Sequence, residues 1–206
     1  MSTMQTPPMD FIRSRTHRNL VSACQGEGQA RRQYLTAADA LEEADLYVAA
    51  HALRFTAAQE KEHAAIFRGL LRVHGSVAPD EPEADPPLLP GSPVEMLRHI
   101  ALSEHGEWDR LYPAFADLAD QEGYPRIATA FRRIAETEHL HARRFLQYAD
   151  ALDTGTLFED PNRLGWLCLR CGHLHYGRRA PDTCSTCGRS RGHFIRSSFE
   201  PFTVTP

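Results

Sequence analysis

Apolar residues recur with helical spacing along four stretches of the chain. Residues 11–73 are rich in Ala, Leu, Glu, Gln and Arg and contain no proline, which predicts two long helices with a break near residues 37–43. The helical pattern resumes over residues 94–122 and returns over residues 126–152. Because a proline inside a helix removes a hydrogen bond and crowds the preceding turn, Pro113 is predicted to kink the third helix.

The segment between the second and third helices, residues 76–93, is too rich in proline to be helical. A link of this length allows the second and third helices to run parallel, because the chain must travel along the bundle between them. The sequence therefore predicts a mainly α protein, built on a four-helix bundle of ferritin-like topology with a long crossover.

Beyond the fourth helix the sequence changes character. Residues 166–194 are rich in turn-forming residues and lack a helical period. A segment this short buries little apolar surface, so another kind of cross-link must hold it together. Two unequal domains are predicted, a bundle over residues 1–153 and a small domain over residues 154–206.

Charge and composition limit the classes of partner. The net charge of -4 at pH 7 argues against nucleic acid or an anionic membrane, since either calls for a basic surface. The first residues lack the apolar region of a secretion signal, and the chain contains no unbroken apolar run of roughly 18 residues. A cytoplasmic protein that acts on small molecules or other proteins is expected.

The stretch AETEHLHARRF, residues 135–145, contains the spacing Glu-x-x-His twice. Successive residues of a helix turn by about 100°, so the two pairs face different ways. Glu138 and His141 fall on the apolar stripe that faces the core. Glu136 lies about 160° from Glu138, and it belongs with His139 to the flank and the outer face.

The same test applied to the other helices finds acidic residues on every inward face. On the second helix Glu60 and His63 share the apolar stripe, whereas Glu62 does not. The remaining inward acids lie on the first helix (Glu27) and on the third (Glu104 and Glu107).

Five carboxylates and two imidazoles in a bundle core need a compensating charge. An unpaired buried carboxylate costs several kcal/mol even after relaxation, against a domain stability of roughly 5 to 15 kcal/mol. Two divalent cations would supply that charge. One Glu from each of two helices, with Glu-x-x-His from each of the other two, is the ligand pattern of di-iron and di-manganese bundles. Carboxylate and imidazole ligands favour iron or manganese over calcium.

Four of the five cysteines form two Cys-x-x-Cys-Gly pairs with twelve residues between them, namely Cys168, Cys171, Cys184 and Cys187. In a chain without a secretion signal this pattern favours a metal site over disulfides. Each glycine can take the positive φ that turns backbone N–H groups towards sulfur. Four thiolates suit a structural zinc ion or a single electron-transfer iron. The fifth cysteine, Cys24, is predicted to be a small core residue.

These motifs together resemble the rubrerythrin family from about residue 13 to residue 199. The similar strings are GEGQARRQY, QEKEHA, SEHGEW and IAETEHLHARRF, followed by the paired cysteines. The resemblance implies a ferritin-like di-iron domain followed by a rubredoxin-like domain. It implies two iron ions in the bundle and one in the four-cysteine site, where zinc is the alternative. The implied iron ligands are Glu27, Glu60, His63, Glu104, Glu107, Glu138 and His141, with the four cysteines as rubredoxin-type ligands.

The resemblance also implies an activity. The expected reaction is reduction of hydrogen peroxide to water in defence against oxidative stress, as in an NADH peroxidase-type oxidoreductase. Tyr34 and Tyr112 are implied beside the ligands, and Glu107 is implied as an extra carboxylate in a centre where one iron alternates between Glu and His coordination. The thiolate-bound iron is expected to relay electrons from a rubredoxin-type or NAD(P)H-dependent donor within a homodimer.

Two alternatives remain open at the level of sequence. One is a ferroxidase or iron-handling protein whose tail is a structural zinc ribbon, and the other is a redox sensor that signals through a partner. Two departures from the family pattern are also visible. Ser185 stands where such cysteine pairs commonly have proline, and the crossover at residues 76–93 is longer than expected.

Overall fold

A computed structural model of the protein describes residues 10–78, 89, 91–162 and 165–197. The first helical pair consists of α1 (Arg15–Glu43) and α2 (Tyr47–Val73). Most of the predicted crossover lies outside the described residues. Within the described part of the chain, no helix combines the length and the apolar character needed to cross a bilayer.

The break between α1 and α2 lies at residues 44–46, directly after the region near residues 37–43 where the sequence predicts it. Residues 37–43 contain good helix formers and neither glycine nor proline, so nothing in them stops the helix. The helix ends where Asp45 adopts a φ of 60°. The N–H of Leu46 then bonds to the carbonyl of Leu41 at 2.8 Å, which satisfies a carbonyl at the helix end.

The third helix is interrupted rather than kinked at its proline. It consists of α3 (Pro93–Gly106), a π-helical turn η2 (Glu107–Leu111) and α4 (Tyr112–Gln121). Pro113 lies in the first turn of α4, where its missing N–H costs little. The irregularity is the π turn that precedes it, in which the N–H of Tyr112 bonds to the carbonyl of Glu107.

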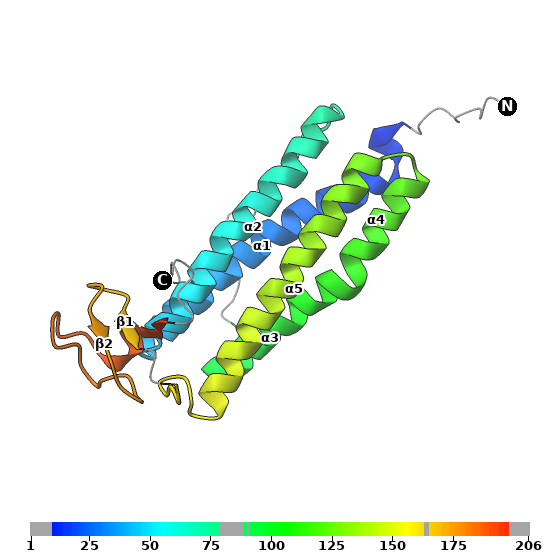
Figure 1. The fold of residues 1–206 in the computed structure, drawn as a ribbon. Coiled ribbons are helices and arrows are strands. Elements are labelled where there is room, and N and C mark those ends of the chain that lie inside the picture. The colour runs from blue at the N-terminus through cyan, green and yellow to red at the C-terminus, as the bar shows by residue number, and fades with distance from the viewer. Residues whose placement is uncertain (1–9, 79–88, 90, 163–164, 198–206) are drawn as a thin grey trace.

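The fourth helix, α5 (Pro125–Asp153), completes an elongated bundle (Figure 1). Helix α2 and the α3–α4 segment run in the same direction, as the long crossover requires (Figure 1). The bundle core consists of two separate apolar clusters. One contains Phe67 and Phe131, and the other contains Leu53 and Phe145. The layer between these two clusters contains the acidic residues described below.

The C-terminal unit is a small three-stranded antiparallel sheet in the order β2-β1-β3. Its strands are β1 (Trp166–Cys168), β2 (Leu174–His175) and β3 (Phe194–Arg196), and η3 (Arg191–His193) precedes β3. Trp166 and Phe194 form its core together with Cys168 and Cys184. The absence of any larger apolar cluster among these described residues agrees with a unit that depends on a cross-link.

This unit packs against the end of the bundle where α1 turns into α2. The rings of Tyr47 and His193 stack with centroids 3.7 Å apart, and the hydroxyl of Ser190 donates to the carboxylate of Asp45. A Cβ added to Gly192 would lie 1.8 Å from the carbonyl oxygen of Asp45, so only glycine fits there. The unit is therefore tightly fitted onto the turn.

Candidate metal centres

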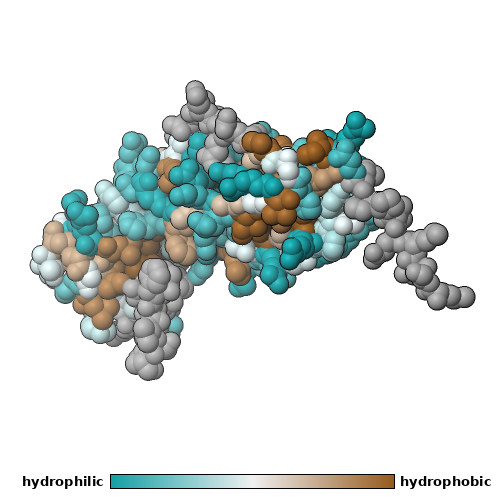
Figure 2. All heavy atoms as spheres, turned by 90° about the horizontal axis from the view of Figure 1, so that it is seen from above, coloured by the Kyte–Doolittle hydropathy of each residue, from teal (hydrophilic) through white to brown (hydrophobic). Residues whose placement is uncertain are grey.

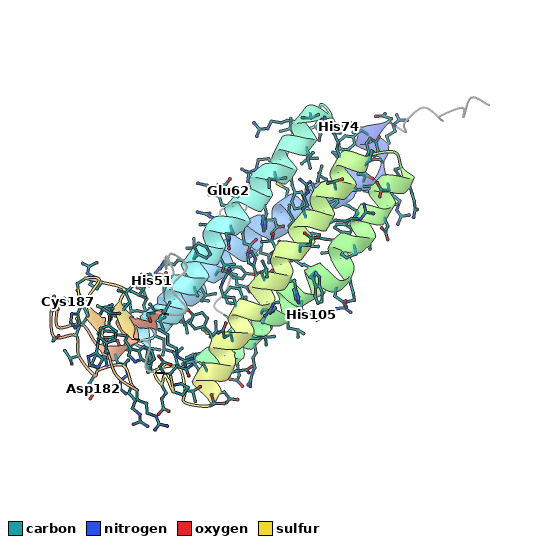
Figure 3. The ribbon with its side chains drawn as sticks, in the orientation of Figure 1. His51, Glu62, His74, His105, Asp182 and Cys187 are labelled. Atoms are coloured by element: carbon teal, nitrogen blue, oxygen red, sulfur yellow. The ribbon has the colours of Figure 1, made fainter. Side chains whose placement is uncertain are left out.

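Six of the seven predicted bundle ligands lie in the layer between the two apolar clusters, and all six are buried. Each of the four long segments contributes, since the six are Glu27 on α1, Glu60 and His63 on α2, Glu104 on α3, and Glu138 and His141 on α5. Glu62, on the outer side of α2 by the helical count, is exposed (Figure 3). The interleaved pairs are thus separated as helical geometry requires.

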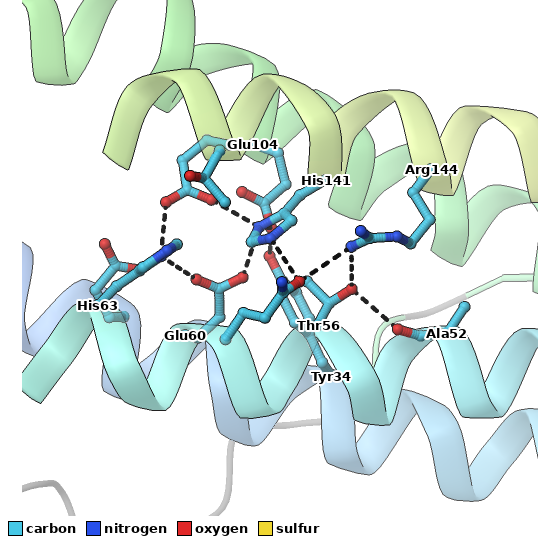
Figure 4. A network of polar contacts seen from close by, with 12 residues as sticks. Tyr34, Ala52, Thr56, Glu60, His63, Glu104, His141 and Arg144 are labelled. Atoms are coloured by element: carbon cyan, nitrogen blue, oxygen red, sulfur yellow. Dashed lines mark hydrogen bonds and ion pairs between the residues drawn. The ribbon is translucent and has the colours of Figure 1, made fainter. Parts of the chain in front are cut away.

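Two carboxylates lie between the two imidazoles (Figure 4). Nδ1 of His63 lies 2.9 Å from an oxygen of Glu60 and 2.9 Å from an oxygen of Glu138. Nδ1 of His141 lies 2.9 Å from the other oxygen of Glu60 and 2.7 Å from the other oxygen of Glu138. Each of these carboxylates therefore offers one oxygen to each side of the centre.

One further carboxylate completes each side. Glu27 joins Glu60, His63 and Glu138 in one group of four ligand atoms, and these atoms lie within 4.8 Å of one another. Glu104 joins Glu60, Glu138 and His141 in a second group that meets the same limit. We refer to these as the Glu27–His63 position and the Glu104–His141 position.

The polar atoms at the two positions fit a pair of cations. Within the described residues, both oxygens of Glu138, Oε1 of Glu60 and Nδ1 of His141 are buried and have no hydrogen-bond partner outside the cluster of ligand groups. Buried oxygens and nitrogens in that condition are costly unless a cation receives them. Two divalent ions would satisfy these atoms and offset the carboxylate charge.

Without cations the cluster must bind protons instead. Burial raises the pKa values of Glu27 and Glu104 well above their usual range, and the neighbouring Glu138 and Glu60 add to the rise. Burial lowers the pKa of His63, but its hydrogen bonds to Glu138 and Glu60 outweigh this effect and raise it to about 10. Ligand groups that bind protons this strongly release them when a metal binds.

Two buried tyrosines each hold one of the outer carboxylates. The hydroxyl of Tyr34 donates to Oε1 of Glu104, and the hydroxyl of Tyr112 donates to Oε1 of Glu27 at 2.5 Å. Burial, followed by the nearby carboxylates, raises the pKa of both phenols well above the usual value of 10.0. Both phenols therefore remain protonated donors near neutral pH.

Glu107 lies beside the centre but in neither group of four. It begins the π turn, is half-buried and interacts with the hydroxyl of Tyr112. Burial raises its pKa to about 8, and the charges of Glu138 and Glu60 contribute. The structure thus places His63, rather than Glu107, against Glu60 and Glu138, and the role of Glu107 as a ligand stays a prediction.

The four cysteines converge on a single point in the small C-terminal unit. Sγ of Cys168 lies 3.8 Å from Sγ of Cys187, and Sγ of Cys171 lies 3.7 Å from Sγ of Cys184. All four sulfurs lie within 4.8 Å of one another. Burial raises the pKa of Cys184, but backbone N–H groups outweigh this effect and lower it to about 6. Cys184 therefore favours the thiolate form, which binds metals.

The glycines after each pair have the predicted positive φ. Gly172 has a φ of 75° and Gly188 a φ of 73°. Their N–H groups bond to the carbonyls of Cys168 and Cys184, each at 2.9 Å, and so close the two turns. Two matching turns of this kind present four thiolates to one tetrahedral ion.

Comparison with known proteins agrees with both centres. Residues 18–149 match the family model described as rubrerythrin, and residues 166–195 match the model described as the rubredoxin-like domain of rubrerythrin. The chain belongs to the rubrerythrin family. The predictions of a ferritin-like bundle and of a small rubredoxin-like four-cysteine unit are confirmed, and members of this family carry a di-iron site and a rubredoxin-like site.

Similar proteins cover most of the chain. A rubrerythrin of Porphyromonas gingivalis is 36% identical over 186 residues, which span 88% of this chain and 89% of the relative. A rubrerythrin of Clostridium perfringens is 34% identical over 183 residues, which span 88% and 93%. The solved structure of fully reduced, all-ferrous nigerythrin has a TM-score of 0.62 and 26% identity, and covers 95% of this chain and 98% of that one.

One departure from the rubrerythrin pattern has a visible structural counterpart. Ser185, which stands where proline is common, lies with its Oγ 3.2 Å from Nε2 of His173. This contact joins the two cysteine turns on their exposed side.

Sequence reasoning missed the contacts around the outer nitrogen of His141. Gln59, Thr56 and Arg144 lie there. Gln59 directly precedes the ligand Glu60, and Arg144 follows His141 by three residues. Only the packing of α2 against α5 brings them together.

Proposed function

We propose that this protein is a peroxide reductase of the rubrerythrin type, which converts hydrogen peroxide to water in defence against oxidative stress. The supporting observation is that Glu60 and Glu138 belong to both ligand groups, so that two metal ions would lie side by side in a buried layer. We further propose iron in both bundle positions and in the four-cysteine site, with electrons that originate from NADH.

The reduction of hydrogen peroxide to two water molecules consumes two electrons and two protons. A pair of ferrous ions, when bound, supplies the two electrons and Lewis acidity. We assign the bundle ligands to Glu27, Glu60, His63, Glu104, Glu138 and His141. The surrounding apolar clusters exclude bulk water, so that the electrostatic interactions of these ligands are only weakly screened.

The chain's own hydroxyl groups hold the outer ligands and supply protons. Tyr34 and Tyr112 fix Oε1 of Glu104 and of Glu27, one on each side of the centre. We assign both tyrosines to proton donation close to the reacting oxygens. Glu107 is assigned as the additional carboxylate, which would offer its oxygens to the centre from the side of Tyr112 and His63. Its π turn is a form of helix often found at functional sites.

Electrons must reach the bundle from the four cysteines, which we assign as the ligands of a relay iron. The small unit contacts α2 at Tyr47, and Glu60 lies thirteen residues further along that helix. At 1.5 Å per residue this separation is about 20 Å. Transfer within one chain is therefore long, and we propose a homodimer in which the cysteine site of one chain approaches the bundle centre of the other.

Exposed apolar residues support such a contact. A groove of about 970 Å³ runs between α2, α5 and the small unit. Phe55, Leu140 and Leu146 line it, and each is at least 40% exposed. Apolar side chains lie at the surface of both the bundle and the small unit (Figure 2). Surface of this kind is typical of contacts between protein chains.

The domain boundary at residue 153 and a cytoplasmic location stay predictions.

The test combines metal analysis with rapid mixing. Protein expressed with sufficient iron should contain three irons per chain and show the red absorption of an iron–tetrathiolate site. The reduced protein, mixed with peroxide in a stopped-flow instrument, should be reoxidised faster than with dioxygen. Two irons with one zinc, no red absorption and no preference for peroxide would instead support the iron-handling alternative.

A further inference from the structure

The two imidazoles of the bundle are alike on the metal-facing side and different on the outer side. Nε2 of His141 lies 3.1 Å from Oε1 of Gln59. For Nε2 of His63, no hydrogen bond is found among the residues that the structure describes. His141 is also fully buried, whereas His63 retains 7% of its accessible surface. Among the described residues, a hydrogen bond at Nε2 therefore fixes the ring of His141 but not that of His63.

Arg144 determines which way the Gln59 amide points. Its Nη1 lies 3.4 Å from Oε1 of Gln59 and 2.8 Å from Oγ1 of Thr56. Because arginine can only donate, the Gln59 atom that faces Arg144 must be the oxygen. The same oxygen faces His141, so Nε2 of His141 must carry the proton.

The hydrogen bonds that Arg144 and Thr56 make can all form at once, because each has one donor and one acceptor (Figure 4). The hydroxyl of Thr56 donates to the carbonyl of Ala52 at 2.9 Å, which leaves its oxygen free to accept from Arg144. The guanidinium of Arg144 also lies over the ring of Phe55, 5.2 Å from the centroid. Arg144 is therefore fixed in place by α2 on two sides, by a hydroxyl and by an aromatic ring.

We propose that Gln59 and Arg144 are positioning residues for His141. They hold its proton on Nε2, so that Nδ1 directs a lone pair at the Glu104–His141 position, and they make this position the tighter of the two metal positions. The proposal rests on the metal centre proposed above. Its physical basis is that an imidazole already fixed in orientation and tautomer need not reorganise when a metal binds.

Cobalt(II) provides a probe of both positions without redox chemistry. The full chain, with zinc in its four-cysteine site, is titrated with cobalt under anaerobic conditions, and the visible bands of each bound ion are followed. The unaltered chain should bind two ions with unequal affinity. Gln59→Leu and Arg144→Met should each weaken the tighter step roughly 10- to 100-fold and leave the weaker step unchanged. Arg144→Lys, which retains a donor, should recover part of the loss.

The proton on Nε2 gives a second measurement. In the cobalt-loaded chain, the metal shifts the N–H signal of each imidazole ligand out of the crowded part of the NMR spectrum. In Gln59→Leu the His141 signal should exchange faster with water, whereas the His63 signal should remain as it was. Arg143→Met is the matched control, because this exposed arginine lines the same groove but is not among the contacts of Gln59 and Thr56.

Three outcomes would overturn the proposal. One is two equal cobalt steps in the unaltered chain, and another is a Gln59→Leu variant that binds cobalt as the unaltered chain does. The third is an equal loss at both steps together with a lower unfolding temperature, which would show that the contacts only hold α2 against α5. A bundle that binds no cobalt would contradict the metal centre itself, and this inference with it.

Discussion

The hydroxyl of Tyr112 donates a hydrogen bond to Oε1 of Glu27 at 2.5 Å, and this bond connects the irregular third helix to the first helix beside the metal centre. In a Tyr112→Phe variant that oxygen loses its donor, and a buried acceptor left without a partner costs about 1 to 3 kcal/mol. Steady-state peroxide reduction should fall roughly 10-fold or more. Tyr176→Phe is the control, because Tyr176 is 69% exposed and lies in the small unit. Equal rates in the two variants would contradict the role of Tyr112.

Glu107→Ala should keep the fold and most of the bundle iron, because six other ligands remain. Peroxide turnover should nevertheless slow by roughly 10-fold or more, the usual effect of losing a group that supports a metal centre. Metal analysis and stopped-flow reoxidation by peroxide measure the two effects. Glu136→Ala, at an exposed position, is the matched control. An unchanged peroxide rate in Glu107→Ala would show that the extra carboxylate has no part in the reaction.

Cys171→Ser should separate the chemistry in the bundle from the supply of electrons. Cys171 is one of four sulfurs that meet in the small unit, which contacts the bundle at the start of α2. A single turnover of chemically reduced protein with peroxide should proceed at the usual rate, while steady-state turnover with a reduced donor should stop. Cys24→Ala, a change in the apolar bundle core, should affect neither. A normal steady-state rate in Cys171→Ser would refute the relay.

Removal of the metals should make stability depend on pH. The carboxyl of Glu107 has its pKa raised from 4.5 to about 8, and burial is the main cause. Folding favours its protonated form, so this contribution declines as the pH rises from about 4.5 to 8. The pKa of His63 is raised from 6.5 to about 10 through its hydrogen bonds to Glu138 and Glu60, against the effect of burial. Its contribution is complete below 6.5 and disappears as the pH rises through about 10.

At the acidic end a third group acts in the opposite direction. Burial raises the pKa of Glu138, but hydrogen bonds to His141 and His63 outweigh this and lower it to about 2. Its contribution disappears only as the pH falls from about 4.5 towards 2. The free energy of unfolding of the metal-free chain, measured with urea, should therefore decline from about pH 5 to pH 10. The metal-loaded chain should show a much flatter profile. A metal-free chain that becomes more stable over this range would contradict the assigned cluster.

Much of the fold and the site follows from periodicity alone. On a regular helix the side of each residue is a matter of counting, and this is why the sequence separates Glu138 and His141 from Glu136 and His139. The cysteine turns follow from local chemistry as well, because Cys-x-x-Cys-Gly specifies its own geometry.

Features that depend on contacts between helices did not follow from the sequence. A π turn begins at Glu107 and changes the helical count by one residue, and counting turns of 100° along a regular helix does not reveal it. The hydrogen bond between Gln59 and His141 joins residues 82 positions apart. The end of α1 also depends on Asp45, which adopts a left-handed conformation. Glycine is the usual sequence signal for this conformation at a helix end, and aspartate is a much weaker one.

The close fit of Gly192 against Asp45 has a consequence for how the protein can work. A domain on a flexible linker could move towards its electron acceptor. Here the cysteine cluster is packed tightly against the end of the bundle where α1 turns into α2. The position of the cluster relative to the bundle of its own chain is therefore set when the chain folds. Under the relay proposed above, the path of electrons into a bundle is therefore set by how whole molecules pair, and turnover should depend on assembly.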